Sequence, residues 1–121
     1  SLRGVEILFK ILVVLHFVGL ASLLGGFLVQ MSTKPRGINN AMLHGVLTQV
    51  VTGIAMVGIV SADLLEDETV DNSKIGVKLL IALFVLGAVL LGRRKPADEQ
   101  QPYWAAAGAL TLVNVIVAVF V

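Results

Sequence analysis

Hydrophobic residues fall into four long blocks along the chain, separated by three short stretches rich in charged, polar and turn-forming residues. Each block reaches or approaches the ~20 apolar residues that a helix needs to cross a bilayer. Proline and glycine in the segment 32–37, and the basic run with proline at 93–96, mark the ends of two blocks. The pattern predicts four helical spans, at residues 5–31, 40–62, 73–92 and 102–121.

The connections between these spans are short, which favours antiparallel packing of neighbours along the chain. Asn39 or Asn40 is placed to cap the first turn of the second span. We therefore expect an all-α fold: a four-helix transmembrane bundle, up-down-up-down, that forms one transmembrane domain over residues 1–121.

Composition narrows the classes of function. Of the 121 residues, 57% are hydrophobic and 14% are charged, and the mean hydropathy is +0.94; a soluble domain has roughly 25% charged residues. Four spans leave no room for a soluble catalytic domain. The absence of cysteine excludes disulfides, thiolate metal sites and iron–sulfur clusters. The net charge of +1 and the lack of a basic aromatic patch argue against nucleic acid as a partner.

Charged residues indicate an orientation in the membrane. The first and third loops lie on one side and carry five basic residues: Lys34, Arg36, Arg93, Arg94 and Lys95. The other side carries four basic residues. The positive-inside rule places these loops in the cytoplasm and both termini outside it. We expect a multi-pass protein of the plasma (inner) membrane that contacts membrane lipids.

Two loops carry further signals. Tyr103 and Trp104, next to the basic run Arg93-Arg94-Lys95, are predicted to anchor the fourth span at the membrane interface, where the basic run can also contact anionic lipid. The second loop, 63–71, carries five carboxylates. These lack the spacing and the central glycine of a calcium loop, so we interpret them as solvated.

Small residues recur at four-residue spacing in every span, and such pairs let helix backbones approach closely in lipid. The pairs are Ala21/Gly25, Ser22/Gly26, Ala41/Gly45, Gly58/Ala62, Ala88/Gly92 and Ala105/Ala109. They predict tight packing, either within the chain or against a partner.

A few polar residues lie at membrane depth. Measured from the basic side at ~1.5 Å per residue, Gln49 lies ~14 Å deep and both Thr52 and Asn114 lie ~18 Å deep, with Thr111 one turn shallower than Asn114. We expect these four residues to form one cluster between the second and fourth spans. They either supply interhelical hydrogen bonds or line a site for a small ligand or ion.

His16 lies mid-span in the first helix, ~21 Å from the basic side. An ionisable residue at that depth is a candidate to bind haem, a metal or a quinone head group, or to relay a proton. The alternative is a neutral imidazole that hydrogen-bonds to a neighbouring helix. His44 lies only ~6 Å from the basic side, so the two histidines of one chain are not expected to share a haem.

The chain resembles a family of small four-span integral membrane proteins from actinobacteria. The resemblance rests on His16-Phe17-Val18-Gly19, Gly25-Gly26-Phe27, the run Arg36-Gly37-Ile38-Asn39 with Met42-Leu43-His44-Gly45, and the segment 74–78, together with Asn114 in a valine-rich last span. More distantly, a histidine in the first span is similar to copper-resistance D-type membrane proteins. The methionine and histidine clusters expected of a copper path are missing here. The resemblance implies a topology rather than an activity.

Three functions compete. The first is a non-enzymatic accessory subunit that stabilises a larger membrane complex, such as a respiratory supercomplex, through contacts with other membrane subunits. The second is a redox membrane protein that binds haem, quinone or a metal through His16. The third is a small multidrug-type transporter, for which His16 would be the proton site because the first span has no mid-membrane carboxylate. No nucleophile–base pair lies at a common depth, so we expect no enzymatic activity and no obligatory cofactor.

Overall fold

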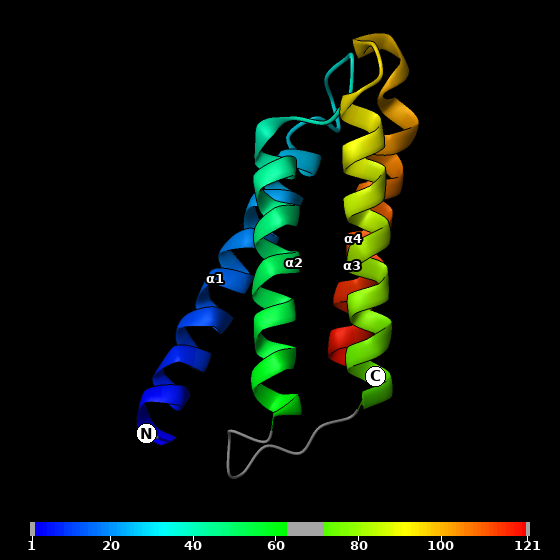
Figure 1. The fold of residues 1–121 in the computed structure, drawn as a ribbon. Helices are drawn as coiled ribbons and strands as arrows, with labels where there is room; N and C mark the ends of the chain where they lie inside the picture. The colour runs from blue at the N-terminus through cyan, green and yellow to red at the C-terminus, as the bar shows by residue number, and fades with distance from the viewer. Residues whose placement is uncertain (1, 63–71, 121) are drawn as a thin grey trace.

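The computed structural model describes residues 2–62 and 72–120, with side chains for 3–62 and 76–120. The helices are α1 (Leu2–Leu28), α2 (Asn40–Ser61), α3 (Asn72–Arg93), a short 3-10 helix η1 (Ala97–Glu99) and α4 (Gln101–Phe120) (Figure 1). All four α-helices are long and apolar enough to cross a membrane. The predicted all-α four-helix bundle with up-down-up-down order is confirmed. The acidic loop predicted at 63–71 lies outside the described residues.

The helix ends follow local signals in the sequence. Asn39 caps α2 as predicted, because its side-chain oxygen accepts a hydrogen bond of 2.9 Å from the backbone N–H of Met42. α1 ends at Leu28, three residues before the predicted boundary. There the chain tightens into a turn in which the N–H of Met31 bonds to the carbonyl of Leu28.

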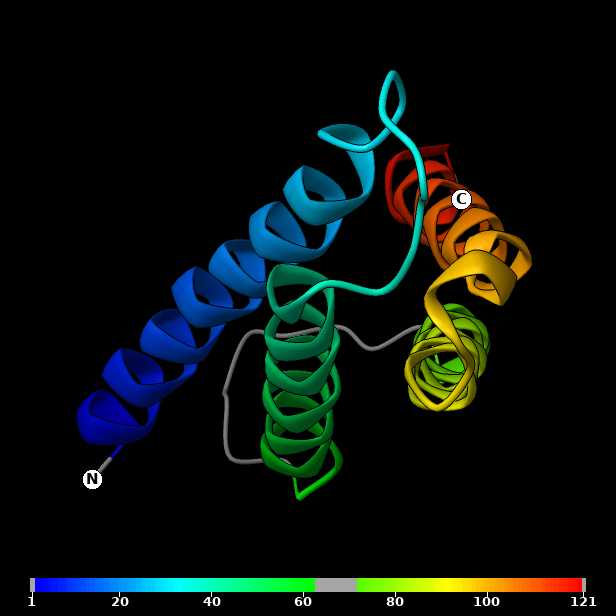
Figure 2. The same cartoon turned by 90° about the horizontal axis from the view of Figure 1, so that it is seen from above.

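The helices pack as two hairpins, α1 with α2 and α3 with α4, and α2 lies beside α3. Figure 2 shows α1 running obliquely away from the other three helices toward its N-terminus. The crossing point of α1 and α2 is built on glycine. A Cβ on Gly45 would lie 2.4 Å from the backbone nitrogen of Leu23 and 2.7 Å from the carbonyl oxygen of Gly19. Only the absence of a side chain allows this approach.

The small-residue pairs predicted from spacing divide into two groups. Gly26, Gly45 and Gly92 pack tightly against neighbouring segments, and Ser22 donates a hydrogen bond of 2.7 Å to the carbonyl of Ala41 across the first hairpin. By contrast, no described atom lies within 4 Å of a Cβ built on Gly25 or on Gly58. Ala21, Ala62, Ala105 and Ala109 are exposed on the outside of the bundle.

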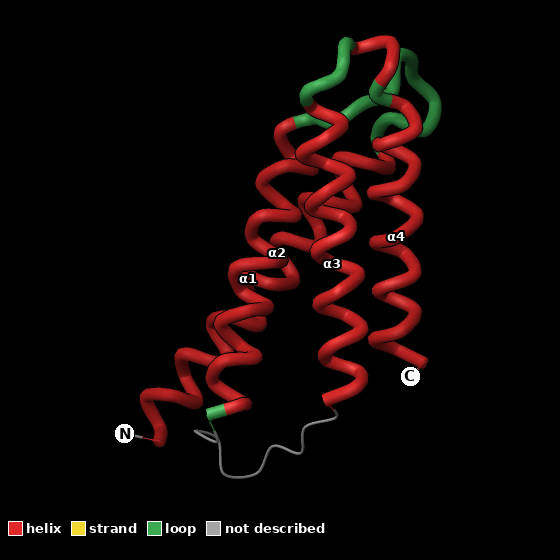
Figure 3. The backbone as a smooth tube through the Cα atoms, turned by 45° about the vertical axis from the view of Figure 1, so that its right-hand side comes forward, coloured by secondary structure: helices red, strands yellow, loops and turns green. Residues whose placement is uncertain are grey.

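The hairpins are joined at the end of the bundle that carries the basic loops, which lie together in Figure 3. Trp104 stacks against Phe27 there, and the backbone N–H of Ile38 donates to the side-chain oxygen of Gln100 over 2.9 Å. Gly108 provides the space for Phe27, since a Cβ on Gly108 would lie 2.0 Å from the ring. The buried core begins just below with Met42, Val46, Val85 and Val89.

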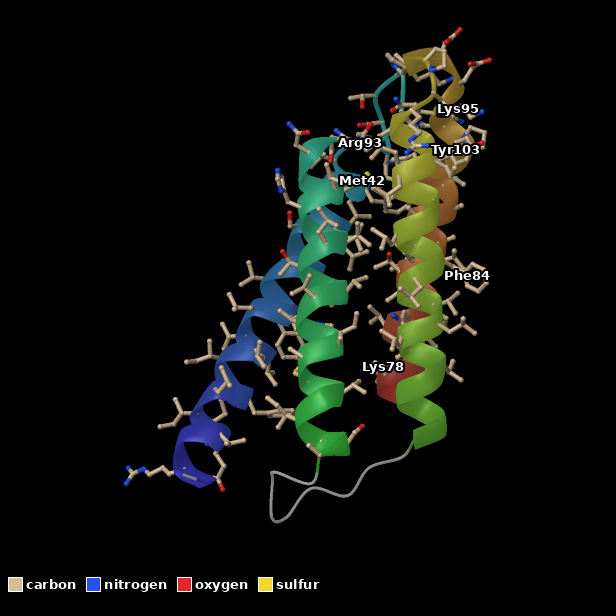
Figure 4. All side chains as sticks on the ribbon, viewed as in Figure 1. Met42, Lys78, Phe84, Arg93, Lys95 and Tyr103 are labelled. Atoms are coloured by element: carbon tan, nitrogen blue, oxygen red, sulfur yellow. The ribbon has the colours of Figure 1, made fainter. Side chains whose placement is uncertain are left out.

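Large apolar side chains cover the outside of the bundle. Phe84 on α3 is 62% exposed and points away from the other helices in Figure 4. Phe17 and Val51 are similarly exposed on α1 and α2. A surface of this kind is unfavourable in water and suited to lipid, as expected of a multi-pass membrane protein.

Candidate functional site

The polar residues of the spans gather around a cavity inside the bundle, in the half away from the basic loops. Its volume is about 220 Å³. Each of the four helices contributes one polar side chain: His16, Gln49, Lys78 and Asn114. We call this space the intramembrane cavity. A second hollow of about 90 Å³ shares these four side chains and also contacts Thr111.

The rest of the lining of the intramembrane cavity is apolar. It is formed by Phe9, Gly53, Met56, Val57, Leu79 and Ala82. Apolar walls around a few convergent polar groups are typical of ligand sites. The cavity is smaller than the ~300–1,000 Å³ of most sites for drug-sized ligands. Its size therefore suits a single head group rather than a whole large cofactor.

His16 is held by α2. Its Nδ1 lies 2.7 Å from the hydroxyl oxygen of Thr52, and the side-chain amide of Gln49 donates a hydrogen bond to the backbone carbonyl of His16. The Thr52 hydroxyl in turn donates to the carbonyl of Thr48 over 2.6 Å. A hydroxyl has one hydrogen, so Thr52 must accept from His16, and Nδ1 carries the imidazole proton. Nε2 is left as the acceptor nitrogen of the neutral ring.

Asn114 is held by α3. Its Nδ2 donates a hydrogen bond of 3.2 Å to the backbone carbonyl of Lys78. Its Oδ1 is buried and has no hydrogen-bond partner among the described residues. An unpaired buried acceptor is costly, especially in a membrane where water does not compensate it. A hydrogen-bond donor that reached this oxygen would therefore be stabilising.

The predicted cluster of Gln49, Thr52, Thr111 and Asn114 forms differently from the expectation. In the described part of the chain, no hydrogen bond joins Gln49 or Thr52 to Thr111 or Asn114. Gln49 and Thr52 instead bond to His16 on α1, while Thr111 bonds to the carbonyl of Ala107 in its own helix. The predicted depths agree with the structure, in which Gln49 and Asn114 line one cavity. The hydrogen-bond partners of these residues differ from the predicted ones.

Lys78 lines the intramembrane cavity but was not predicted from the sequence to do so. It lies six residues into α3, about 9 Å from the start of the helix. Figure 4 labels it in the half of the bundle away from the basic loops. It lines both hollows and brings a positive charge to them. A basic residue inside a predicted span was the signal that could have identified it.

The two histidines lie apart. His44 is exposed near the start of α2, eight residues before Thr52, the partner of His16. That separation is about 12 Å along the helix. The geometry agrees with the expectation that one chain does not bring both histidines to one haem.

The predicted interface residues are found at the basic end. Arg93, Arg94 and Lys95 are exposed there, and Tyr103 is half-buried against Gly92. The prediction that Trp104 faces the membrane interface is wrong. The residue is only 6% exposed, because its ring packs between the hairpins with Arg36 over its face at 5.3 Å. The indole N–H finds its acceptor inside the protein and not in the lipid head groups.

Comparison of the chain with protein family models, curated proteins and solved structures found no match. The family resemblance drawn from the sequence therefore stays a prediction.

Proposed function

We propose that this multi-pass membrane protein is non-enzymatic and binds the polar head group of a lipid-soluble molecule in the intramembrane cavity. The observation that carries the proposal is the convergence of His16, Gln49, Lys78 and Asn114, one from each helix, on a space with apolar walls. Polar groups at this depth cost free energy unless they pair with other groups or take part in binding or function. The apolar surroundings suit the body or tail of a molecule that arrives from the bilayer.

Among the ligands considered for His16, a quinone-type head group fits best. The histidines are too far apart along the bundle for bis-histidine haem, as shown above. No group of three or more His, Cys, Asp or Glu side chains that could hold a metal occurs within the described ranges. A quinone ring is small, uncharged and attached to an apolar tail.

The binding of a short-tailed quinone tests this function. We expect native mass spectrometry of the protein in a nonionic detergent to detect one decylubiquinone or decylubiquinol per chain. His16→Ala should weaken binding at least tenfold. His44→Ala is the matched control, because His44 is an exposed histidine outside the cavity. The proposal fails if neither form of the probe binds, or if both substitutions have the same effect.

A second candidate, an accessory subunit of a larger membrane complex such as a respiratory supercomplex, is supported by small residues that the bundle does not use. Gly25, Gly58 and the pair Ala105/Ala109 face outward. Such residues favour close contact with the helices of another subunit. Both roles are compatible with one protein, since a subunit can carry a bound lipid-soluble molecule.

Purification of the tagged chain in mild detergent, followed by mass spectrometry of what accompanies it, tests the accessory role. We expect a defined set of membrane subunits that is depleted by Gly25→Leu. Val51→Leu, at a lipid-exposed position of α2, should leave the set unchanged. Recovery of the isolated chain without defined partners would exclude this role.

We also propose an orientation of the bundle in the membrane. The basic loops lie at one end of the bundle, and the N-terminal end of α1 and the C-terminal end of α4 lie at the other (Figure 1). With the basic end in the cytoplasm of a cell with a plasma (inner) membrane, both termini are outside it. The intramembrane cavity then lies in the outer half of the membrane.

A further inference from the structure

Besides the Lys78 ammonium, the polar groups of the intramembrane cavity offer hydrogen-bond acceptors, and this restricts the ligand. The amide nitrogens of Gln49 and Asn114 are both used, on the carbonyls of His16 and Lys78. Their oxygens have no hydrogen-bond partner in the described part of the chain. The Nε2 of His16 is equally without a partner there, since the Thr52 contact involves Nδ1.

Resting on the proposed function, we infer that the intramembrane cavity selects a head group that carries a hydroxyl, such as a phenol or a quinol, over its carbonyl form. A hydroxyl hydrogen can bond to Nε2 of His16, or to one of the two amide oxygens. A quinone carbonyl has no hydrogen to donate, so it leaves all three acceptors unpaired.

Lys78 also lines the intramembrane cavity, and an ammonium is a hydrogen-bond donor. A hydroxyl oxygen can accept a hydrogen bond from an ammonium while its own hydrogen is donated to an imidazole.

The selectivity depends on one hydrogen bond, from Nδ1 of His16 to Thr52. This contact keeps the proton on Nδ1 and leaves a lone pair on Nε2. Replacement of the Thr52 hydroxyl by a methyl group removes the acceptor of Nδ1. The imidazole can then carry its proton on Nε2, where it becomes a donor and pairs with a carbonyl instead.

The test compares decylubiquinol with decylubiquinone under anaerobic conditions, by native mass spectrometry of the complete chain. We expect the quinol to bind at least tenfold more tightly, since one unmet buried hydrogen bond changes affinity by about this factor. Thr52→Val should reduce or reverse the preference. Thr52→Ser, which keeps the hydroxyl, should retain it and so controls for folding.

The outcomes separate this inference from the function on which it rests. Equal binding of the two forms, or tighter binding of the quinone, overturns the selectivity and leaves head-group binding standing. A preference that survives unchanged in Thr52→Val overturns the role assigned to the imidazole tautomer. Failure of both forms to bind overturns the proposed function itself.

Discussion

The indole nitrogen of Trp104 donates a hydrogen bond of 3.1 Å to the carbonyl oxygen of Phe27, and the centroids of the two rings lie 4.6 Å apart. Phe27 lies in the last turn of α1 and Trp104 in the first turn of α4. The Trp104 side chain thus joins the first helix to the last, across 77 residues of sequence. Long-range contacts of this kind define the fold more than the apolarity of the spans does.

Trp104→Phe should lower the free energy of unfolding by about 1–3 kcal/mol. The substitution keeps an aromatic ring against Phe27 but removes the N–H donor and leaves unfilled space in a buried site. Thermal melting of the protein in detergent, or titration with a denaturing detergent, measures the change. Phe84→Leu serves as the control, because Phe84 is 62% exposed on the outer face. Equal stability of the two variants would contradict the structural role of Trp104.

Gly45→Ala should loosen the first hairpin and destabilise the protein by about 1–3 kcal/mol. The added methyl group would meet backbone atoms of Leu23 and Gly19, which cannot rotate away. Gly58→Ala adds the same group to the same helix at a position where no described atom lies within 4 Å of it, so we expect no destabilisation there. The two melting curves can be compared directly. A loss of stability in Gly58→Ala alone would be incompatible with the observed helix crossing.

Nitrogen-15 NMR of labelled histidine should find His16 as the neutral ring with its proton on Nδ1. The prediction follows from the single hydroxyl hydrogen of Thr52, which is already donated to the carbonyl of Thr48. In Thr52→Val the ring should shift toward the tautomer protonated on Nε2, while Thr52→Ser should resemble the unsubstituted protein. A proton on Nε2 in the unsubstituted protein would contradict the assignment.

The orientation can be measured with single cysteines, because the chain has none of its own. In intact cells, a membrane-impermeant maleimide should label Arg3→Cys, near the start of α1. It should spare Asp98→Cys, in η1 at the basic end, until the membrane is broken. Both positions are exposed. The reverse pattern would place the basic loops outside the cytoplasm and contradict the positive-inside assignment.

Hydropathy predicted the spans well because the bilayer sets their length and excludes charge from their centres. The second, third and fourth helices begin and end within one residue of the predicted limits. The first differs by three residues at each end. At its C-terminal end, the side chain of Arg36 accounts for part of the change, since it donates to the carbonyls of Gln30 and Met31 and stabilises a turn there.

The partners of the polar residues were harder to predict than their depth. Depth follows from the helical rise, so His16 and Asn114 were placed at similar levels and do line one cavity. The rotation of each helix about its axis does not follow in the same way, because lipid and protein interior are both apolar and the helices have no strongly polar face. For this reason Thr52 of the second span was expected to meet residues of the fourth span, but it bonds to His16 of the first. Trp104 was misassigned for the same reason.

The positions of the close contacts between the two hairpins have a consequence for the intramembrane cavity. Phe27–Trp104, Ile38–Gln100 and the tight approach of Gly108 to Phe27 all lie toward the basic end. Toward the other end, no described atom lies within 4 Å of a Cβ built on Gly58 or Gly76, and α1 leans outward (Figure 1). These contacts lie away from the intramembrane cavity, so occupation of the cavity does not require any of them to break.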